Sequence, residues 1–317
     1  MKVKDFKWHE GITVSNLVEN LGKVGFQSVE LLKAKKLIIK MKKNNAKIFL
    51  TFTSNMVTSG LRGFFAQIIK LGIPNFLVTT AGSIEEDIMK SLGEKFQIGS
   101  YDSDDVELHE QGVNHVGNLM IKNESYMNFE DWVTAALEKC YNKKKKWSVS
   151  ELIKEFGLML DDENSILYQA AKKNVPIFCP AITDAGIGFH LYLFKEKHKD
   201  FFVDIIEDFG NILLSTSFDD KKGVIALGGS ISKHHALLAT LLNGGAEYAL
   251  YMTTAHKQSG SMSGATVSEA KSWGKVKDES DIAMVLGDAT IMFPLAMSAA
   301  LDELNSESLL DSKEKNE

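Results

Sequence analysis

Three side chains that could together act on an amine lie close to one another near the end of the sequence. Glu269, Trp273 and Lys275 follow a loop of small residues at 259–265. The carboxylate could pair with an ammonium, the indole could offer a cation–π surface, and the lysine could form an imine. The same segment also fits a solvated helix start with one packed tryptophan, because short motifs often arise by chance. Taken alone, it leaves both interpretations open.

The elements that would position these side chains are predicted from apolar runs and helical patterns. Continuous apolar runs indicate buried parallel strands, and they lie at residues 46–52, 75–79, 175–180, 223–227, 246–252 and 282–286. Helical patterns lie between them, at residues 60–71, 85–92, 129–140, 148–156, 164–172, 202–214 and 234–242. This alternation predicts an α/β fold: a Rossmann-like, doubly wound, mainly parallel sheet flanked by helices.

One domain is expected over residues 1–317, because no long linker rich in Pro, Gly or Ser divides the chain. Residues 1–45 carry helical patterns around 13–21 and 28–41, which predict an N-terminal arm that wraps the core or a neighbouring subunit. Residues 306–317 are polar and charged, and we expect this tail to fray.

All six predicted strands are followed by small or polar residues. These strand ends lie at residues 53–60, 79–87, 181–188, 228–235, 253–255 and 287–290. Ligands of open parallel sheets bind beyond the carboxyl ends of the strands, where backbone amides can meet phosphates and a carboxylate can meet a ribose. Such residues also make ordinary turns and caps, but six on one edge favour a nucleotide site. The GxGxxG and GxxxxGK[ST] motifs are absent, which argues against an ATP-hydrolysing P-loop protein.

Charge and composition exclude several classes of protein. A formal net charge of −6 argues against a general nucleic-acid binder, and we interpret the basic run 143–146 as a solvated loop. No apolar run approaches the roughly 18 residues of a membrane span, and the N-terminus lacks the apolar region of a secretion signal. We therefore expect a cytoplasmic protein. No metal site is predicted, since the two cysteines are isolated and the adjacent His234 and His235 would diverge on a helix.

Two further sets of titratable residues have open interpretations. Glu85 and Glu86 could favour a helix dipole as acids of a first turn, or could bind a ribose hydroxyl and a cationic substrate. His234, after the Gly228–Gly229 turn, could carry protons at neutral pH or could be a packed or capping histidine.

Together, these segments resemble the deoxyhypusine synthase family from about residue 53 to residue 298. The most specific pieces are residues 79–87, 113–118, 228–235, 263–265 and 269–275, with support from Asn118, Asn123-Glu124 and the box 129–132. The length leaves no room for long eukaryotic insertions and is typical of an archaeal-type member.

The resemblance implies NAD-dependent transfer of the 4-aminobutyl group of spermidine to one lysine of a translation initiation factor, with release of 1,3-diaminopropane. It implies Lys275 as the imine-forming nucleophile, and burial beside Trp273 could keep its amine free of a proton. It also implies a homotetramer in which paired subunits share active sites.

The resemblance also assigns binding residues by their match to the family motifs. For NAD the matching positions are Ser54, Asn55, Met56, Val57, Thr58, Thr80, Ala81, Gly82, Glu86, Asp184, Gly229, Thr254, Asp288 and Ala289. For the polyamine they are Glu85, Glu86, His234, Gly260, Ser261, Ser263, Gly264, Ala265, Thr266, Glu269, Trp273 and Lys275.

Four positions depart from the pattern of eukaryotic members. Phe189, Ser259 and Met262 stand where that pattern has Asp, and Leu238 stands where it has Asn. Each lost carboxylate removes a partner for a protonated amine. The pocket could bind spermidine through a different acidic set, or the protein could use another amine or a small-molecule acceptor, as in homospermidine formation. A non-catalytic NAD-binding module is a further alternative.

Overall fold

The computed structural model describes residues 2–311, and these form two compact units. The first unit comprises residues 2–53, 70–78 and 209–311, and the second comprises residues 54–69 and 79–208. Residues 312–317, which are half of the tail that we expect to fray, lie outside the described residues, and helix α14 (Ala289–Ser306) ends where that tail begins. The prediction of one domain over the whole chain stays a prediction.

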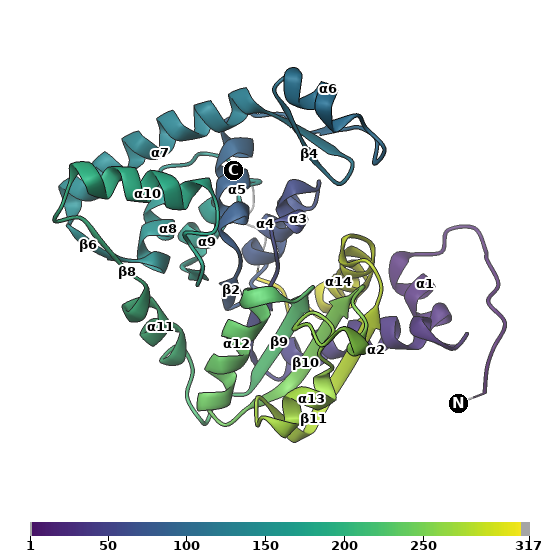
Figure 1. The fold of residues 1–317 in the computed structure, drawn as a ribbon. Helices are drawn as coiled ribbons and strands as arrows, with labels where there is room; N and C mark the ends of the chain where they lie inside the picture. Colours follow the sequence, from purple (N-terminus) through teal and green to yellow (C-terminus); the bar gives the residue numbers. More distant parts are fainter. Residues whose placement is uncertain (1, 312–317) are drawn as a thin grey trace. The chain divides into compact units, whose positions relative to one another are not determined.

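A parallel sheet forms the centre of the first unit (Figure 1). Its strands are β1 (Lys47–Thr51), β2 (Phe76–Val78), β9 (Lys222–Leu227), β10 (Ala246–Thr253) and β11 (Val276–Leu286). They pair in the order β11-β10-β9-β1-β2, and every pair is parallel. Continuous apolar runs suit these strands because helices cover both faces of the sheet. The predicted mainly parallel α/β fold is confirmed.

Two layers of helices flank this sheet. Helices α12 (Ser230–Leu242) and α13 (Val267–Ser272) lie on the near side in Figure 1, and α2 (Gln27–Lys43) lies behind the sheet. The short η1 turn (Lys257–Ser259) precedes α13. Helix α1 (Val14–Leu21) packs on α2 and α14, and α2 packs on β10 and β11. The two helices predicted in the N-terminal arm are therefore confirmed, and they cover the core of their own unit.

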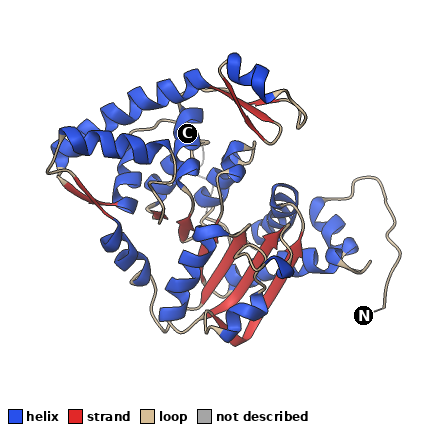
Figure 2. Cartoon of the chain, viewed as in Figure 1, coloured by secondary structure: helices blue, strands red, loops and turns tan. Residues whose placement is uncertain are grey.

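The second unit is largely helical (Figure 2). Its helices are α3 (Asn55–Thr58), α4 (Arg62–Lys70), α5 (Ala81–Ser91), α6 (Asp105–Glu110), α7 (Asn123–Lys143), α8 (Val149–Leu158), α9 (Ile166–Lys173), α10 (Gly186–Lys197) and α11 (Ile205–Leu213), and α11 runs on into the first unit. Strands β3 (Gln97–Ile98), β5 (Leu119–Lys122) and β4 (Val113–Val116) form a small antiparallel sheet, β6 (Lys146–Ser148) pairs with β8 (Phe202–Asp204), and β7 (Ile177–Phe178) precedes α10.

Helix α5 lies at the centre of the second unit, where α3, α7, α9 and α10 all contact it. This position buries three consecutive acids, Glu85, Glu86 and Asp87. Successive residues of a helix point about 100° apart, so each acid faces a different neighbour. The helices packed around α5 therefore hold the three carboxylates in three different environments.

Asp87 connects α5 to α4 through Arg62, which is the only arginine in the sequence, and to α9 directly. The Arg62 guanidinium donates to one Asp87 carboxylate oxygen, to Asp162 at 2.6 Å and to the Ser91 hydroxyl. Asp87 also accepts from the Leu167 N–H at 2.8 Å, in the first turn of α9. A planar fork of five donors can serve several oxygens at once, which a lysine ammonium cannot do in the same geometry.

Several sequence predictions are wrong in detail. Residues 202–204, predicted as helix, form strand β8, and α5 begins at Ala81 rather than at residue 85. Glu85 and Glu86 are therefore not acids of a first turn, and the helix-dipole interpretation of them fails. The run 143–146 is exposed as expected, but only Lys144 and Lys145 form a loop, because Lys143 ends α7 and Lys146 begins β6. No helix in the described part of the chain is long and apolar enough to cross a membrane.

Candidate active site

Three of the predicted strand ends lie side by side in the first unit. The Gly228 N–H donates to the Met252 carbonyl at 2.7 Å, and the Gly287 N–H donates to the Thr253 carbonyl at 2.9 Å. The carboxyl ends of β9, β10 and β11 therefore share one edge of the sheet. The predicted cofactor residues at this edge are Gly229, Thr254, Asp288 and Ala289.

The turn after β9 is tightly packed against the loop 259–265. Gly228 has a φ of +78°, and a Cβ added at Gly229 would lie 2.3 Å from the Ser263 Cα. Ser230, which begins α12, also has a positive φ of 62°, a conformation that is strained for a residue with a side chain. Only glycine can stand at position 229 without moving the loop, so the turn and the loop form one rigid wall.

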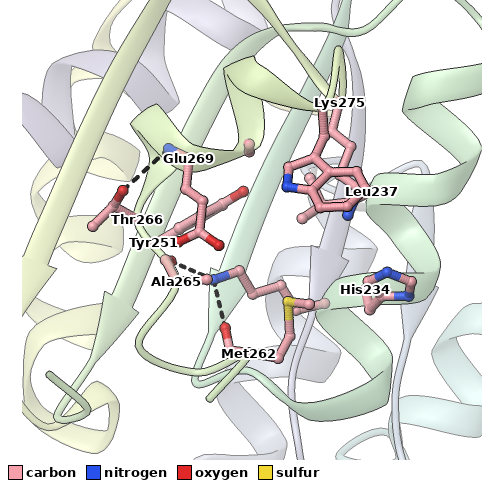
Figure 3. Close-up of a pocket in the computed structure, with 11 residues that line it drawn as sticks. His234, Leu237, Tyr251, Met262, Ala265, Thr266, Glu269 and Lys275 are labelled. Carbon is pink, nitrogen blue, oxygen red and sulfur yellow. Dashed lines mark hydrogen bonds between the residues drawn. The ribbon is translucent and has the colours of Figure 1, made fainter. Parts of the chain in front are cut away.

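A pocket opens between this wall, α12 and α13 (Figure 3). It is lined by Lys233, His234, Leu237, Tyr251, Met262, Ala265, Thr266, Glu269, Ala270, Trp273 and Lys275. Six predicted polyamine residues are in this set, namely His234, Ala265, Thr266, Glu269, Trp273 and Lys275. Gly260, Ser261, Ser263 and Gly264 belong to the adjoining loop but do not line the pocket.

Lys275 lies buried in the pocket, with 8 % of its surface exposed. Its backbone is fixed on both sides, because its N–H donates to the Ala270 carbonyl at 3.0 Å and its carbonyl accepts from Ala246 and Thr240. Its Nζ lies 5.1 Å from the centroid of the Trp273 ring. Within residues 2–311 this Nζ donates no hydrogen bond. The Lys275 amine thus lies at the pocket without a hydrogen-bond partner in the described part of the chain.

Lys233 is a second buried lysine in the same pocket, but its amine is fully engaged. Its Nζ donates to the Met262 carbonyl at 3.0 Å and to the Ala265 carbonyl at 2.9 Å. It also lies 3.9 Å from the centroid of the Tyr251 ring. Burial lowers the pKa of Lys233 to about 8, while the charge of Glu269 raises it and that of Lys275 lowers it. These contacts make Lys233 a fixed cation that holds the pocket wall.

The two adjacent histidines have different surroundings. His234 lines the pocket, and burial, followed by the charge of Lys275, lowers its pKa. Its imidazole is therefore neutral at pH 7 and can accept a proton. His235 packs against Phe209 at 5.4 Å between ring centroids, and burial lowers its pKa to about 4. Among the described residues no group of three or more His, Cys, Asp or Glu side chains could hold a metal ion.

Helix α13 brings Glu269 to the pocket. The Thr266 hydroxyl accepts a hydrogen bond from the Glu269 N–H at 3.1 Å and so caps the helix. Trp273 follows one turn later and is 64 % exposed. The predicted helix start is thus correct, but the alternative of a packed tryptophan is wrong. An exposed indole beside a carboxylate can bind an incoming cation.

The second unit holds a separate cluster around α5. Glu85 accepts from the Ile187 N–H at the start of α10, and Glu86 accepts from the Thr58 hydroxyl at 2.6 Å. Burial raises the pKa of each carboxyl to about 7, against the lowering effect of these hydrogen bonds. Burial raises the pKa of the Tyr126 phenol, and the charges of Glu86 and Glu85 add to this effect. With a pKa near 7, each carboxyl can lose its proton when a cation approaches, because a positive charge stabilises the carboxylate.

The predicted cofactor segments of the second unit also meet one another. A Cβ added at Gly82 would lie 3.1 Å from the Ser54 Cβ, which places the start of α5 against the start of α3. The Thr80 hydroxyl at the N-cap of α5 is buried and has no hydrogen-bond partner within residues 2–311. The predicted residues gathered here are Ser54, Asn55, Met56, Val57, Thr58, Thr80, Ala81, Gly82 and Glu86, and Asp184 lies just before α10.

The four positions that depart from the family pattern have different surroundings. Only Met262 lines the pocket. Ser259 is exposed in the loop, Leu238 is half-buried on α12, and Phe189 is 58 % exposed on α10 of the second unit.

Three polar residues near the candidate sites were not predicted: Lys233, Tyr251 and Tyr126. Lys233 directly precedes the predicted residue His234, so its place near the site could have been inferred from the sequence, but its contacts could not. Tyr251 is the second tyrosine of strand β10, and nothing in the apolar run distinguishes it from the first.

Comparisons with known proteins agree on one family. The family profile described as deoxyhypusine synthase matches residues 16–300. A protein from Thermoplasma volcanium named a probable deoxyhypusine synthase is 39 % identical over 302 residues, which cover 94 % of this chain and 97 % of the relative. A protein of the same name from Schizosaccharomyces pombe is 37 % identical, over 91 % of this chain and 87 % of the relative.

A solved structure agrees with these relatives. The crystal structure of an Entamoeba histolytica protein assigned as a deoxyhypusine synthase aligns with a TM-score of 0.66 and 27 % identity. The alignment covers 94 % of this chain and 96 % of that protein. Sequence and fold thus point to the same family over nearly the whole length of the chain.

Proposed function

Because this chain belongs to the deoxyhypusine synthase family and is thus a transferase, we propose that it moves the 4-aminobutyl group of spermidine to a lysine of a translation initiation factor, with NAD as cofactor. One observation supports this most directly. Lys275 is buried in a pocket beside a carboxylate and an indole, and its Nζ donates no hydrogen bond within residues 2–311.

The residues assigned to NAD fit a nucleotide by their chemistry. The unpartnered Thr80 hydroxyl and the N–H groups at the start of α5 could meet phosphate or ribose oxygens, and Glu86 could accept from a ribose hydroxyl. In the first unit, Gly229, Thr254, Asp288 and Ala289 lie at a sheet edge of the kind that binds nucleotides. Bound NAD would take up a hydride when the amine is oxidised to the imine, and would return it to the imine formed on the lysine of the factor.

Lys275 would carry the group transfer. Once it has lost a proton, its Nζ attacks the imine carbon of the oxidised substrate, a new carbon–nitrogen bond forms, and the bond to 1,3-diaminopropane breaks. A proton passes to the leaving nitrogen, and the butyl carbon stays on Lys275 as an imine. The lysine of the factor then repeats this exchange and frees Lys275. Splitting one displacement into two imine exchanges lowers the barrier of each step.

Glu269 and His234 would support this exchange. The Glu269 carboxylate can pair with an ammonium of the bound amine, and the exposed Trp273 face beside it favours the same charge. His234, neutral at pH 7, can take the proton that Lys275 must lose before it attacks. Lys233 cannot replace Lys275, because its Nζ is bound to two carbonyls.

The test is to trap the enzyme imine. The chain is incubated with NAD and spermidine labelled in the butyl group, reduced with borohydride, and analysed by peptide mass spectrometry. We expect label on Lys275 and release of 1,3-diaminopropane without any factor. Lys275→Arg should abolish the label while NAD still binds, because arginine keeps the charge but cannot act as an amine nucleophile. Label that persists in Lys275→Arg would refute the assignment, and a chain that binds NAD without turnover would be a binding module.

A second candidate is transfer to a small amine, as in homospermidine formation. It is favoured by Met262, which brings a thioether rather than a carboxylate to the pocket. Labelled spermidine with putrescine and no factor distinguishes the two, since free labelled homospermidine supports this candidate. Label that moves only to a lysine of the initiation factor supports the first.

We also propose that the chain acts as a homotetramer and in the cytoplasm. Ile231 and Ile291 are 41 % and 54 % exposed beside the strand ends of the first unit, which suits contact with another subunit. Light scattering of the purified protein tests the tetramer, and cell fractionation tests the location.

A further inference from the structure

One face of helix α5 carries three residues of very different chemistry at a spacing of four. Gly82, Glu86 and Lys90 lie in a row along the helix because residues four apart share a face. This row faces the short helix α3. A Cβ added at Gly82 would lie 3.1 Å from the Ser54 Cβ, and Glu86 accepts from the Thr58 hydroxyl at 2.6 Å. The third member, Lys90, is not among the predicted site residues.

The Lys90 ammonium binds the last carbonyls of α3. Its Nζ donates to the carbonyls of Val57, Thr58 (2.8 Å) and Ser59 (2.9 Å). It also lies 4.7 Å from the centroid of the Phe96 ring. An ammonium has three N–H donors, so these carbonyls occupy all of them.

Helix α3 needs such an outside partner because it is only one turn long. It spans Asn55–Thr58, and the last carbonyls of a helix have no partner N–H within it. A single turn is also too short to be stable by itself in water. Val57 and Thr58 are 0 % and 3 % exposed, so their carbonyls depend on donors from the protein. Lys90 supplies these donors.

The charge of Lys90 suits this position. Burial lowers its pKa to about 8, while the charge of Glu86 raises it, that of Arg62 lowers it and that of Asp87 raises it. Lys90 is therefore mainly an ammonium at pH 7 and keeps its three donors. Burial raises the pKa of Glu86, and the Thr58 hydrogen bond and the charge of Lys90 oppose that rise. Lys90 thus stabilises both the Glu86 carboxylate and the helix that carries its hydrogen-bond donor.

We propose that Lys90 is a positioning residue for the cofactor site: it holds the end of α3 against α5 and so places residues 54–58 and the Glu86 carboxylate for NAD. This inference rests on the proposed function, because it takes NAD as the ligand. The three donors of Lys90 are all bound to carbonyls, so it acts through α3 rather than by contact with the cofactor.

The test compares two lysines of the second unit. Lys195 is the control, because it also lies on a helix, donates to a backbone carbonyl (Phe201, at 2.7 Å) and lies over a phenylalanine ring, but at the end of α10. Lys90→Met and Lys195→Met each remove the ammonium and keep an unbranched side chain. NAD binding to the full chain is measured by calorimetry. Hydrogen exchange of the amides of residues 57–59 is measured by mass spectrometry without NAD.

We expect Lys90→Met to weaken NAD binding by roughly 10-fold, in line with the loss of charge-assisted hydrogen bonds. The amides of residues 57–59 donate to the Ser54 and Asn55 carbonyls, and they should exchange about 10-fold faster in the free variant. Lys195→Met should match the unchanged chain in both measurements. Lys90→Arg keeps the charge and N–H donors, so it should recover most of the affinity for NAD.

A double-mutant cycle tests whether Lys90 acts through Thr58. The loss of NAD affinity in Lys90→Met combined with Thr58→Val should be smaller than the product of the two single losses. Unchanged NAD binding or unchanged exchange in Lys90→Met, equal weakening by Lys195→Met, or single losses that simply multiply would overturn the inference. A Lys90→Met chain that does not fold would also overturn it, since Lys90 would then serve the whole fold. If the unchanged chain binds no NAD, the proposed function fails, and the inference fails with it.

Discussion

Replacing Glu85 by glutamine is expected to stabilise the protein at pH 8 and to leave its stability unchanged at low pH. Burial raises the pKa of the Glu85 carboxyl from 4.5 to about 7 in the folded chain. Between these two values the folded state holds a proton that the unfolded state has lost, so stability falls as the pH rises through this window. Once the pH is above 7, a group with this shift has lowered the free energy of unfolding by about 3 kcal/mol.

Glutamine removes this loss and keeps an oxygen to accept from the Ile187 N–H. Glu86 titrates in the same range nearby, so the effect of Glu85 alone is expected to be smaller than this full value. We expect Glu85→Gln to raise the free energy of unfolding by roughly 1–3 kcal/mol at pH 8 and to leave it almost unchanged at pH 4.5. Urea unfolding of the whole chain at both pH values, followed by circular dichroism, measures this difference. Glu130→Gln, an exposed position of α7, is the control. A gain that is the same at both pH values, or a loss at pH 8, would refute the argument from burial.

Two other substitutions test the lysine and arginine contacts. Arg62→Lys keeps the charge but loses the planar guanidinium that bonds both Asp87 and Asp162. We therefore expect the free energy of unfolding, measured in urea, to fall by about 2–3 kcal/mol. An unchanged free energy of unfolding would contradict this role of the guanidinium. Lys233→Met should raise the KM for spermidine by roughly 10-fold, because it frees two carbonyls of the pocket loop. Lys222→Met is its matched control, since Lys222 is also fully buried and donates to two backbone carbonyls, at 217 and 220, outside the pocket. A KM that rises equally in both variants would point to general destabilisation.

The strands were predictable because burial on both faces leaves a local mark in the sequence. Strand β10, for example, is buried along almost its whole length and reads as one apolar run. Helix α10 was missed because it begins with Gly186, Ile187 and Gly188, which have poor helix propensity. Its start is stabilised by Glu85, about a hundred residues earlier in the chain, and no local pattern can reveal such a contact.

The candidate site was predictable in its residues but not in their division of roles. Lys233 and Lys275 are both lysines next to small residues, and only the family resemblance favoured Lys275. The structure distinguishes them physically, because the partners of Lys233 are carbonyls 29 and 32 residues away. The lack of a hydrogen-bond partner for the Tyr251 hydroxyl within residues 2–311 is likewise a property of packing, since nothing in its own segment says where the side chain ends.

The single arginine gives this chain a built-in reporter of local opening. An arginine-specific protease can cleave only the bond between Arg62 and Gly63, and would release fragments 1–62 and 63–317. In the native state that arginine is 7 % exposed and bonded to two aspartates. Cleavage therefore requires the start of α4 to detach from α5, and its rate measures the free energy of that opening when reclosing is fast. Ligands that bind beside α5 would slow this one cut, so their binding could be measured on a gel without any assay of catalysis.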